Sequence, residues 1–232
     1  MTARMMWCVV PAAGRGTRVG GDCPKQYLPL AGQSLLMHTL ERLAGHPRIA
    51  GLLVTLAAAD GLWPGIDTLH GKPVLTAPGG AERSDSVVAG IDALPATVGV
   101  DDFVLVHDAA RPCVRPTDIS RLIELAGAVD GGLLGAPLRD TLKRASIAGR
   151  SERTEPRDMR WRAFTPQMFR RGQLSAALHG AARQGIQVSD EAMAMELAGF
   201  SPLLVEGAED NIKVTTAADF ALAEFLLDRT VT

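Results

Sequence analysis

A glycine-containing loop with nearby cations has the composition of a phosphate-binding site. The loop reads PAAGRGTR at residues 11–18 and directly follows an apolar run, and Lys25 comes a few residues later. Small residues let backbone amides approach an anion closely, while Arg18 and Lys25 add fixed positive charge. The Walker pattern is absent, and Val19 stands where a dinucleotide fingerprint needs its third glycine. We therefore expect an anion site outside both classes, with a tight turn carrying solvated charges as the alternative.

A second loop, PGGAERSDS at residues 78–86, leads into a helical pattern. Its backbone donors and hydroxyls suit the edge of a nucleobase, because they can pair with ring nitrogens and exocyclic groups at close range. A Gly-Gly pair before a capped helix is also an ordinary turn. This loop therefore supports nucleotide binding only in combination with the first.

Two acidic residues are candidates for metal or phosphate chemistry. Asp108 follows the apolar run 103–106, and Asp210 precedes Lys213 in the segment EDNIKV. A carboxylate at the carboxyl end of a strand could hold Mg²⁺, which prefers oxygen ligands and retains several waters. The alternative is a loop salt bridge between Asp108 and Arg111. His107 receives no catalytic part, because adjacent strand residues point in opposite directions.

Strand and helix patterns alternate along most of the chain, and these elements must position the loops. Apolar runs predict strands at 7–10, 52–56, 73–76, 103–106, 133–136 and 203–205. Helical patterns open at Ser34, Ser84 and Thr117, and later helices are expected near 171–184, 190–198 and 216–227. Continuous apolar strands are covered on both faces, so we expect an α/β fold. Its sheet is mostly parallel, doubly wound and Rossmann-like, with ligands at the carboxyl ends of the strands.

Residues 139–162 interrupt this alternation. The segment carries seven arginines and one lysine against four acidic residues and has no core-forming period. A loop of this length in a compact domain is usually functional. We expect an extended dimerisation arm that contacts a partner subunit, with a disordered surface loop as the alternative.

Length and composition exclude several classes of protein. With 232 residues, 47% of them hydrophobic, the chain can bury a core without disulfides, and we expect one domain over residues 1–232. A formal charge of −2 argues against a nucleic-acid partner, and no apolar run is long enough to predict a membrane span. Cys8, Cys23 and Cys113 form no C-x-x-C pair, so a reducing, cytoplasmic location is expected.

Eight segments together resemble the 2-C-methyl-D-erythritol 4-phosphate cytidylyltransferase family of the non-mevalonate isoprenoid pathway. They are PAAGRGTR, CPKQYLPL, GGAERSDSVVAG, VLVHDAARPCV, APLRDTLKR, TPQMF, SDEA and EDNIKVTT, and the resemblance runs from Val10 to about Leu227. The resemblance implies that CTP and methylerythritol phosphate react by in-line attack on the α-phosphorus, with release of pyrophosphate. Another polyol phosphate such as ribitol 5-phosphate as acceptor, and a nucleotide-binding module without turnover, are the alternatives.

The same resemblance implies a role for each matching residue. Arg18, Lys25 and Lys213 are expected to contact phosphate and stabilise the transition state, and Asp108 to serve Mg²⁺ and substrate. The nucleotide-binding positions are Ala12, Ala13, Gly14, Gly16, Gly80, Ala81 and Ser86. The acceptor-side positions are Arg111, Ser189 and, from the neighbouring subunit of a homodimer, Thr141 and Arg157.

Three positions depart from the family pattern. Ala81 stands where an acidic residue is frequent, so any side-chain contribution to base recognition is absent there. Ser189 replaces a threonine and keeps the hydroxyl, and Thr17 occupies a position that is often basic. The first loop is therefore expected to carry less positive charge than in relatives.

Overall fold

Eight strands form the central sheet of the computed structural model, which describes residues 5–14 and 23–229. In spatial order they are β12 (Leu203–Glu206), β8 (Gly132–Pro137), β11 (Trp161–Arg170), β7 (Phe103–Val106), β1 (Met6–Pro11), β4 (Ile49–Leu56), β6 (Lys72–Pro78) and β5 (Thr68–Leu69). Pairing is parallel between β1 and β4, β1 and β7, β4 and β6, and β8 and β12. The predicted mostly parallel sheet is therefore confirmed.

Besides the short edge strand β5, which pairs antiparallel with β6, one long strand runs against its neighbours. β11 pairs antiparallel with both β7 and β8 in the middle of the sheet. This strand is not among those predicted above, and the residue pattern of a strand does not tell a parallel from an antiparallel neighbour. With β11 antiparallel, the chain leaves the sheet through β8 and returns beside it, so both ends of the intervening segment start from the same edge of the body.

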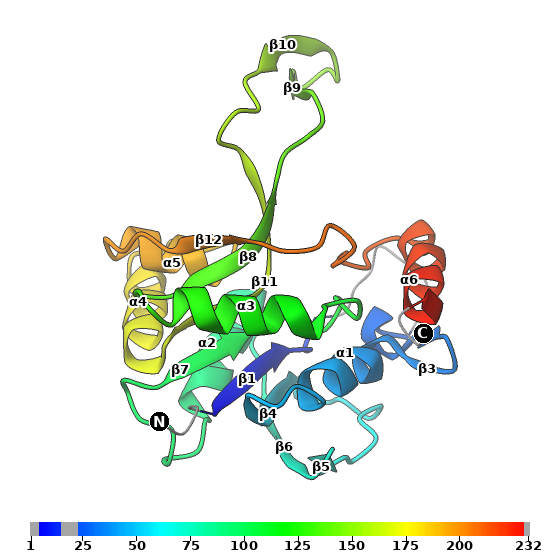
Figure 1. The fold of residues 1–232 in the computed structure, drawn as a ribbon, viewed down its shortest axis with the longest axis vertical. Coiled ribbons are helices and arrows are strands. Elements are labelled where there is room, and N and C mark those ends of the chain that lie inside the picture. The colour runs from blue at the N-terminus through cyan, green and yellow to red at the C-terminus, as the bar shows by residue number, and fades with distance from the viewer. Residues whose placement is uncertain (1–4, 15–22, 230–232) are drawn as a thin grey trace.

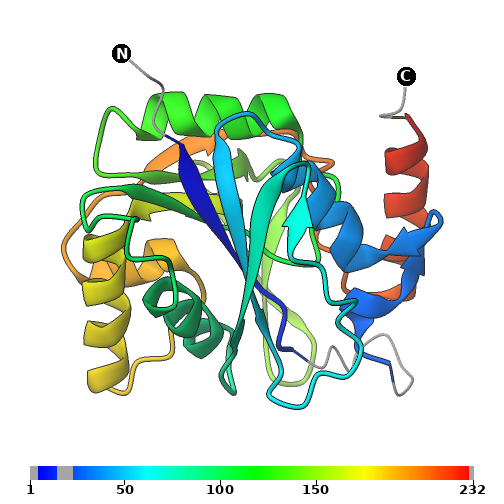
Figure 2. The same cartoon turned by 90° about the horizontal axis from the view of Figure 1, so that it is seen from below.

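Helices cover both faces of the sheet, as predicted (Figure 2). The helices are α1 (Leu35–Ala44), α2 (Arg83–Asp92), α3 (Pro116–Ala126), α4 (Arg171–Arg183), α5 (Glu191–Leu197) and α6 (Ala217–Arg229). Cys8 and Val10 of β1 pack with α1 and α3, whereas Val9 packs with α2, α4 and α5. Alternate residues of a strand point to opposite faces, so β1 contributes to two separate cores. Each fully buried Leu or Val contributes about 1.5–3 kcal/mol.

Helix starts differ from the predictions at two places. Ser34 caps α1 as expected, since its hydroxyl accepts from the Met37 N–H at 3.3 Å. α2, however, begins at Arg83 rather than after Ser84, and the Asp85 carboxylate accepts from the Glu82 N–H. α3 begins at Pro116 rather than after Thr117. Proline is well suited to a first helical position because its missing N–H is not needed there.

Three smaller elements complete the body. Lys25–Tyr27 forms a short 3-10 helix, and β2 (Pro29–Leu30) and β3 (Gln33–Ser34) form a two-stranded ribbon before α1. α6 packs Ala223 and Leu227 against Leu30 and Leu35. Within the described ranges, no helix combines the length and apolar composition needed to cross a membrane.

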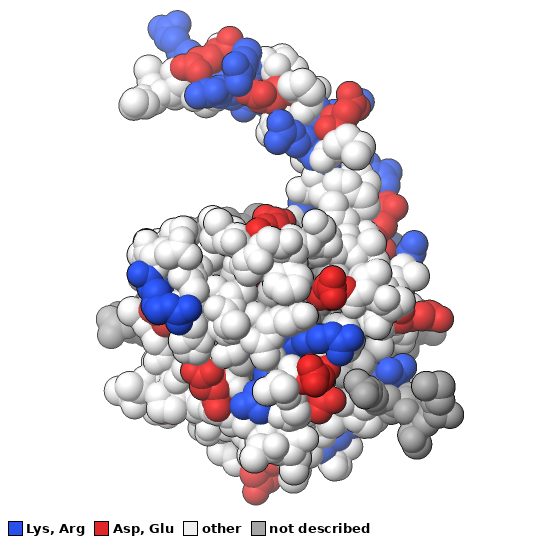
Figure 3. Space-filling model, turned by 90° about the vertical axis from the view of Figure 1, so that its left-hand side faces the viewer, with Lys and Arg blue, Asp and Glu red and all other residues white. Residues whose placement is uncertain are grey.

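Residues 139–162 project away from the body (Figure 1). The segment contains a two-stranded antiparallel ribbon, β9 (Leu142–Ala145) and β10 (Ser151–Glu155), so it has regular structure rather than the disordered alternative. Every residue of β9 is exposed. Charged side chains lie along much of its length (Figure 3). At its base, Glu209 pairs with Arg139 at 2.8 Å and with Arg162, which ties the arm to the body.

Candidate active site

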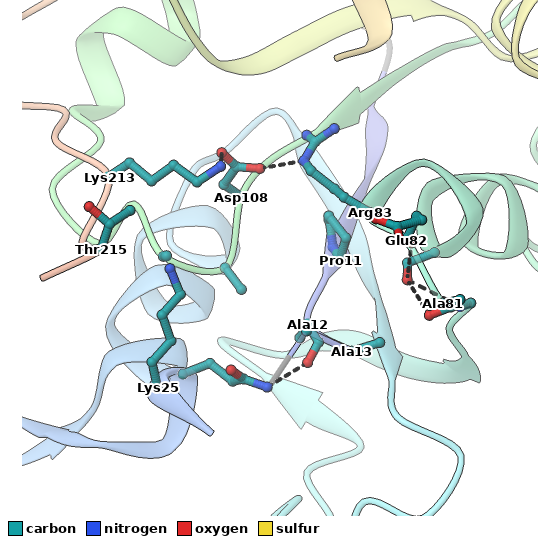
Figure 4. A pocket seen from close by; sticks show the side chains of 16 residues that line it. Pro11, Ala12, Ala13, Lys25, Ala81, Glu82, Arg83, Asp108, Lys213 and Thr215 are labelled. Atoms are coloured by element: carbon teal, nitrogen blue, oxygen red, sulfur yellow. Dashed lines mark hydrogen bonds and ion pairs between the residues drawn. The ribbon is translucent and has the colours of Figure 1, made fainter. Parts of the chain in front are cut away.

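A pocket opens at the carboxyl ends of the parallel strands, where ligands of such sheets bind (Figure 4). Five segments line it: the end of β1, the 3-10 helix, the start of α2, the loop after β7, and the approach to α6. The lining residues are Pro11, Ala12, Ala13, Gly14, Lys25, Gln26, Gly80, Ala81, Glu82, Arg83, Ser86, Asp108, Ala109, Ala110, Lys213 and Thr215. The predicted loops therefore converge on one cavity.

The first loop is held in place by one backbone and one side-chain hydrogen bond. The Ala12 N–H donates to the Thr55 carbonyl at 2.8 Å, and the buried Gln26 amide donates to the Ala12 carbonyl at 2.7 Å. Gly14 is the last described residue before the gap, and Gly16 and Arg18 lie outside the described residues. Gln26 was not predicted, although it stands beside Lys25 in the CPKQY segment.

The second loop lies directly against the first. A Cβ on Gly79 would fall 2.5 Å from the Ala13 Cβ, and one on Gly80 would fall 2.2 Å from the Asp85 Cβ, so both positions require glycine. The buried Ser86 hydroxyl accepts from the Gly80 N–H at 3.1 Å. Ser86 therefore shapes the loop whose backbone lines the pocket.

Two lysines from distant parts of the chain lie in the pocket. Lys25 Nζ donates to the Val214 carbonyl at 2.8 Å, and Lys213 Nζ lies 2.9 Å from Asp108 Oδ2. The Val214 N–H donates to the Ala110 carbonyl, which joins the segment before α6 to the loop after β7. The two lysines are thus fixed at the same cavity by one short stretch of backbone.

Asp108 is surrounded by three cations. Its Oδ1 accepts from Arg83 Nε at 2.8 Å, while Oδ2 faces Lys213 Nζ at 2.9 Å and Arg111 Nε at 3.4 Å. Burial alone would raise the pKa of the Asp108 carboxyl. The charges of Arg83, Lys213 and Arg111 act in the opposite direction and hold that pKa well below its usual range. The salt bridge to Arg111, considered as an alternative, is present, yet Asp108 still lines the pocket.

His107 is buried behind the site. Its two ring nitrogens lie 3.0 Å from the Arg111 carbonyl and 3.1 Å from the Thr165 hydroxyl. Burial lowers the pKa of His107 to about 4, so the ring is neutral near pH 7. This placement agrees with the prediction that His107 has no catalytic part.

A family model described as 2-C-methyl-D-erythritol 4-phosphate cytidylyltransferase matches residues 6–229. The chain belongs to the 2-C-methyl-D-erythritol 4-phosphate cytidylyltransferase family. A relative of that name from Stenotrophomonas maltophilia (strain K279a) is 58% identical over 226 residues, which are 97% of this chain and 97% of the relative. This cytidylyltransferase is therefore a nucleotidyltransferase of the isoprenoid pathway, as predicted, and neither alternative function is favoured.

Solved structures of the cytidylyltransferase family share the fold. The Francisella tularensis 2-C-methyl-D-erythritol 4-phosphate cytidylyltransferase has a TM-score of 0.83 and 32% identity, covering 96% of this chain and 99% of that one. The enzyme of that name from Thermus thermophilus has a TM-score of 0.79 and 31% identity, covering 97% and 99%. The predicted fold class is confirmed by these similarities as well as by the sheet itself.

Four predicted acceptor-side residues lie outside the pocket of this cytidylyltransferase chain. Thr141 and Arg157 are exposed on the arm, where Arg157 donates to the Arg139 carbonyl. Ser189 is exposed before α5, and its backbone N–H lies 3.4 Å from the Met193 sulfur. Arg111 is buried behind Asp108 and donates to the Asn211 carbonyl at 2.7 Å. Thr141 and Arg157 lie on the arm, outside the pocket of their own chain. Their contact with the site of a partner subunit stays a prediction.

Asp210 does not join Asp108. Its carboxylate pairs with Arg115 on the surface side of the loop. Two residues that were not predicted take part instead: Arg83 contacts Asp108 directly, and Glu191 contacts Arg83 on the side away from Asp108. Arg83 stood unremarked in the GGAERSDS motif and Glu191 in SDEA, and no local pattern links two residues so far apart.

Among the described acidic residues, Asp108 and Glu82 line the pocket. No group of three His, Cys, Asp or Glu side chains that could hold a metal occurs in the described ranges. Asp108 lines the pocket, but both of its oxygens already face cations. Mg²⁺ is commonly bound by one or two carboxylates together with substrate phosphates. The residues therefore fit the ion only alongside a polyanionic substrate.

Proposed function

We propose that this pocket is where the chain joins CTP to 2-C-methyl-D-erythritol 4-phosphate, giving 4-diphosphocytidyl-2-C-methyl-D-erythritol and pyrophosphate. The observation that carries the proposal is the convergence of Lys25 and Lys213 on one cavity lined by two small-residue loops. A polyphosphate needs fixed cations, and a base needs close backbone donors. Both are present within this cavity.

The small-residue loops are proposed to hold the cytosine. The positions are Ala12, Ala13, Gly14 and Gly16 on the first loop, and Gly80, Ala81 and Ser86 on the second. Base recognition through backbone groups does not depend on an acidic side chain at Ala81. The buried Ser86 hydroxyl supports this role by keeping the Gly80 N–H in a fixed orientation.

The chemistry is proposed to be in-line displacement at the α-phosphorus. A phosphomonoester is already largely ionised near neutral pH, so no strong general base is required. The protein must bring two polyanions together and neutralise the crowded oxygens, which is the proposed part of Arg18, Lys25 and Lys213. Asp108 and Arg111 are proposed to orient the acceptor, with Ser189 near its phosphate.

Mg²⁺ is proposed as the cofactor, with Asp108 as its protein ligand. When bound, the ion supplies positive charge that neutralises and orients phosphate oxygens. Lys213 would then have to turn from Asp108 toward phosphate, which its flexible side chain permits.

A homodimer is proposed as the working unit. Residues 1–232 would act as a single nucleotidyltransferase domain whose 139–162 arm contacts the partner. Thr141 and Arg157 would then complete the neighbouring site, because both are exposed on the arm and lie outside the pocket of their own chain. A cytoplasmic location is proposed because Cys8, Cys23 and Cys113 are all free thiols.

The proposal is tested by incubating the full chain with each of the four nucleoside triphosphates, Mg²⁺ and methylerythritol phosphate, and measuring pyrophosphate. Of the four triphosphates, only CTP is expected to support rapid release of pyrophosphate. A parallel series with ribitol 5-phosphate tests the acceptor, and a series without metal tests the cofactor. Equal release with all four triphosphates would contradict the assignment of the base-binding loops.

A further inference from the structure

Arg83 joins two carboxylates that come from different parts of the fold. It is the first residue of α2, and its Nε donates to Asp108 Oδ1 at 2.8 Å. Its terminal nitrogens donate to the two oxygens of Glu191, the first residue of α5, at 2.7 and 3.2 Å. Figure 4 shows Lys213, Asp108 and Arg83 in line across the pocket. Each of the three Arg83 side-chain nitrogens therefore donates a hydrogen bond to one of these carboxylates.

The cluster is most buried at Glu191 and most exposed at Lys213. The side chain of Glu191 is 1% exposed and that of Asp108 is 8% exposed, whereas that of Lys213 is 40% exposed. A buried carboxylate left without its cation is strongly destabilising. Glu191 therefore holds Arg83 in place, and Lys213 is the member of the cluster that is free to move into the pocket.

The formal charges of the buried part balance without Lys213. Two carboxylates, Asp108 and Glu191, face two guanidinium groups, Arg83 and Arg111. Each oxygen of Asp108 has an arginine donor, at 2.8 Å on Oδ1 and 3.4 Å on Oδ2. If Lys213 turned away, Asp108 would still be neutralised. The cluster is therefore electrically neutral without the charge of Lys213, and that charge is surplus in this sense.

We propose that Arg83 is a positioning residue for nucleotidyl transfer: anchored by Glu191, it neutralises Asp108 and so releases Lys213 to bind an incoming phosphate. The proposal rests on the proposed phosphate role of Lys213. Arg83 needs no contact with the substrate, because it acts through the ion pair that Lys213 leaves. Without Arg83, two carboxylates would face only Arg111 and Lys213, and Lys213 would be retained as a counterion.

The first test is Arg83→Met, which keeps the length of the side chain and removes its charge. The KM for CTP is expected to rise at least tenfold in the pyrophosphate assay, with folding checked by circular dichroism. The defect is expected to be no larger than that of Lys213→Met, because Arg83 acts through Lys213. A larger defect would indicate direct contact with the nucleotide and overturn the proposal.

The decisive variant is the double substitution Arg83→Met with Glu191→Gln. It removes one positive and one negative charge, so Asp108 and Arg111 again balance and Lys213 is again surplus. The KM for CTP is expected to return to within about threefold of the unsubstituted protein, although thermal stability falls. A folded double variant whose KM stays as high as that of Arg83→Met would show that Arg83 is needed for shape or contact, and the proposal would fail.

Glu191→Gln alone and Arg83→Lys keep the proposal testable if Arg83→Met does not fold. Glu191→Gln keeps an amide oxygen that can still accept a hydrogen bond from Arg83, and Arg83→Lys keeps a positive charge beside Asp108, so the KM for CTP is expected to stay within about threefold in both variants. A tenfold rise in either folded variant would overturn the proposal. The unsubstituted protein is the reference in the same assay. If it released no pyrophosphate from CTP and methylerythritol phosphate, the proposed function would fail, independently of Arg83.

Discussion

Fixed cations meet at a single cavity because short backbone segments hold them there. Lys25 is anchored to the Val214 carbonyl, next in the chain to Lys213, so the positions of the two ammonium groups depend on each other. Charge that a site holds close to its working position needs little reorganisation when the transition state forms, which is why such groups contribute so much to rate, even where one of them, Lys213, must turn from Asp108 toward phosphate. Single substitutions at this site should therefore affect turnover far more than stability.

Lys25→Ala is expected to lower turnover at least a hundredfold and leave the fold intact. Loss of one fixed charge from a transition state typically costs on the order of 3–4 kcal/mol, or two to three decades of rate. Pyrophosphate release measures the effect and circular dichroism checks the fold. Lys72→Ala is a matched control, because Lys72 also donates to a backbone carbonyl, that of His46, away from the pocket. Near-native turnover of Lys25→Ala would contradict the assignment.

Acid should destabilise the protein partly through His107. Burial lowers its pKa in the folded state to about 4, against about 6.5 in the unfolded chain. The unfolded state therefore binds the proton first as the pH falls, and stability present above pH 6.5 is lost toward pH 4. The loss between pH 7 and 4 is expected to be about 3 kcal/mol from this group.

Urea unfolding at a series of pH values measures this loss. His107→Asn is the comparison, because the pH slope of its unfolding free energy between 6.5 and 4 should be smaller, whatever its absolute stability. Equal slopes in the two proteins would show that His107 titrates normally in the folded state.

At the scale of elements, the position of α2 governs the site. The helix presents Arg83 and Ser86 to the pocket from its first turn, and it lies close to the sheet at Gly90. A Cβ on Gly90 would fall 2.4 Å from Val9 Cγ1 and 3.1 Å from Thr55 Cγ2. This close approach is possible only because the helix carries glycine where it crosses β1.

Gly90→Ala is expected to push α2 away from the sheet and destabilise the protein by about 1–2 kcal/mol, since overpacking outweighs the gain in helix propensity. Activity should fall as well, because Arg83 and Ser86 move with the helix. The unfolding free energy and the KM for CTP measure the two effects.

Gly180→Ala in α4 is the matched control for this substitution. A Cβ there would meet only the end of the flexible Arg183 side chain, at 3.9 Å. It should raise stability by up to about 1 kcal/mol with no change in KM. If both glycine variants were equally stable, the close approach of α2 would not be a constraint.

For the whole molecule, the arm is the feature that projects beyond the compact body (Figure 1). It leaves the sheet through β8 and returns through the antiparallel β11, so both of its ends are anchored in the body. Glu209 adds a pair of ion contacts at its base through Arg139 and Arg162. A projection held this firmly, yet exposed along β9, is suited to reach a second copy of the chain.

Mixing Arg157→Ala protein with Lys25→Ala protein is expected to restore activity. In a symmetric mixed dimer one of the two sites would have both Lys25 and the partner's intact arm. Random exchange of equal amounts should give roughly a quarter of the unsubstituted activity, since about half of the dimers are mixed and each has one complete site. Mass spectrometry of the mixture shows whether mixed dimers form. Mixed dimers without recovered activity would contradict the role of the arm.

Local patterns in the sequence predicted six strands of the central sheet and its helices, and the order of the motifs indicated the family. Alternating apolar runs and helical periods predicted the strands around 7–10 and 103–106, both faces of the sheet, and the loops that line the pocket, because these features depend on neighbouring residues. Motif order predicted the activity. The direction of β11 could not be predicted, because the same apolar run suits a parallel or an antiparallel neighbour.

Only the tertiary structure decided which charges meet. In the folded chain, Arg83 pairs with Asp108 and Glu191. Asp210 pairs with Arg115, although Asp210 lies closer in sequence to Lys213. The sequence determined the chemical groups available to the site, since residue types and motif order are local properties. Their pairing depends on which strand and helix ends the folded sheet brings together, and ion pairs form between neighbours in space, whatever their separation along the chain.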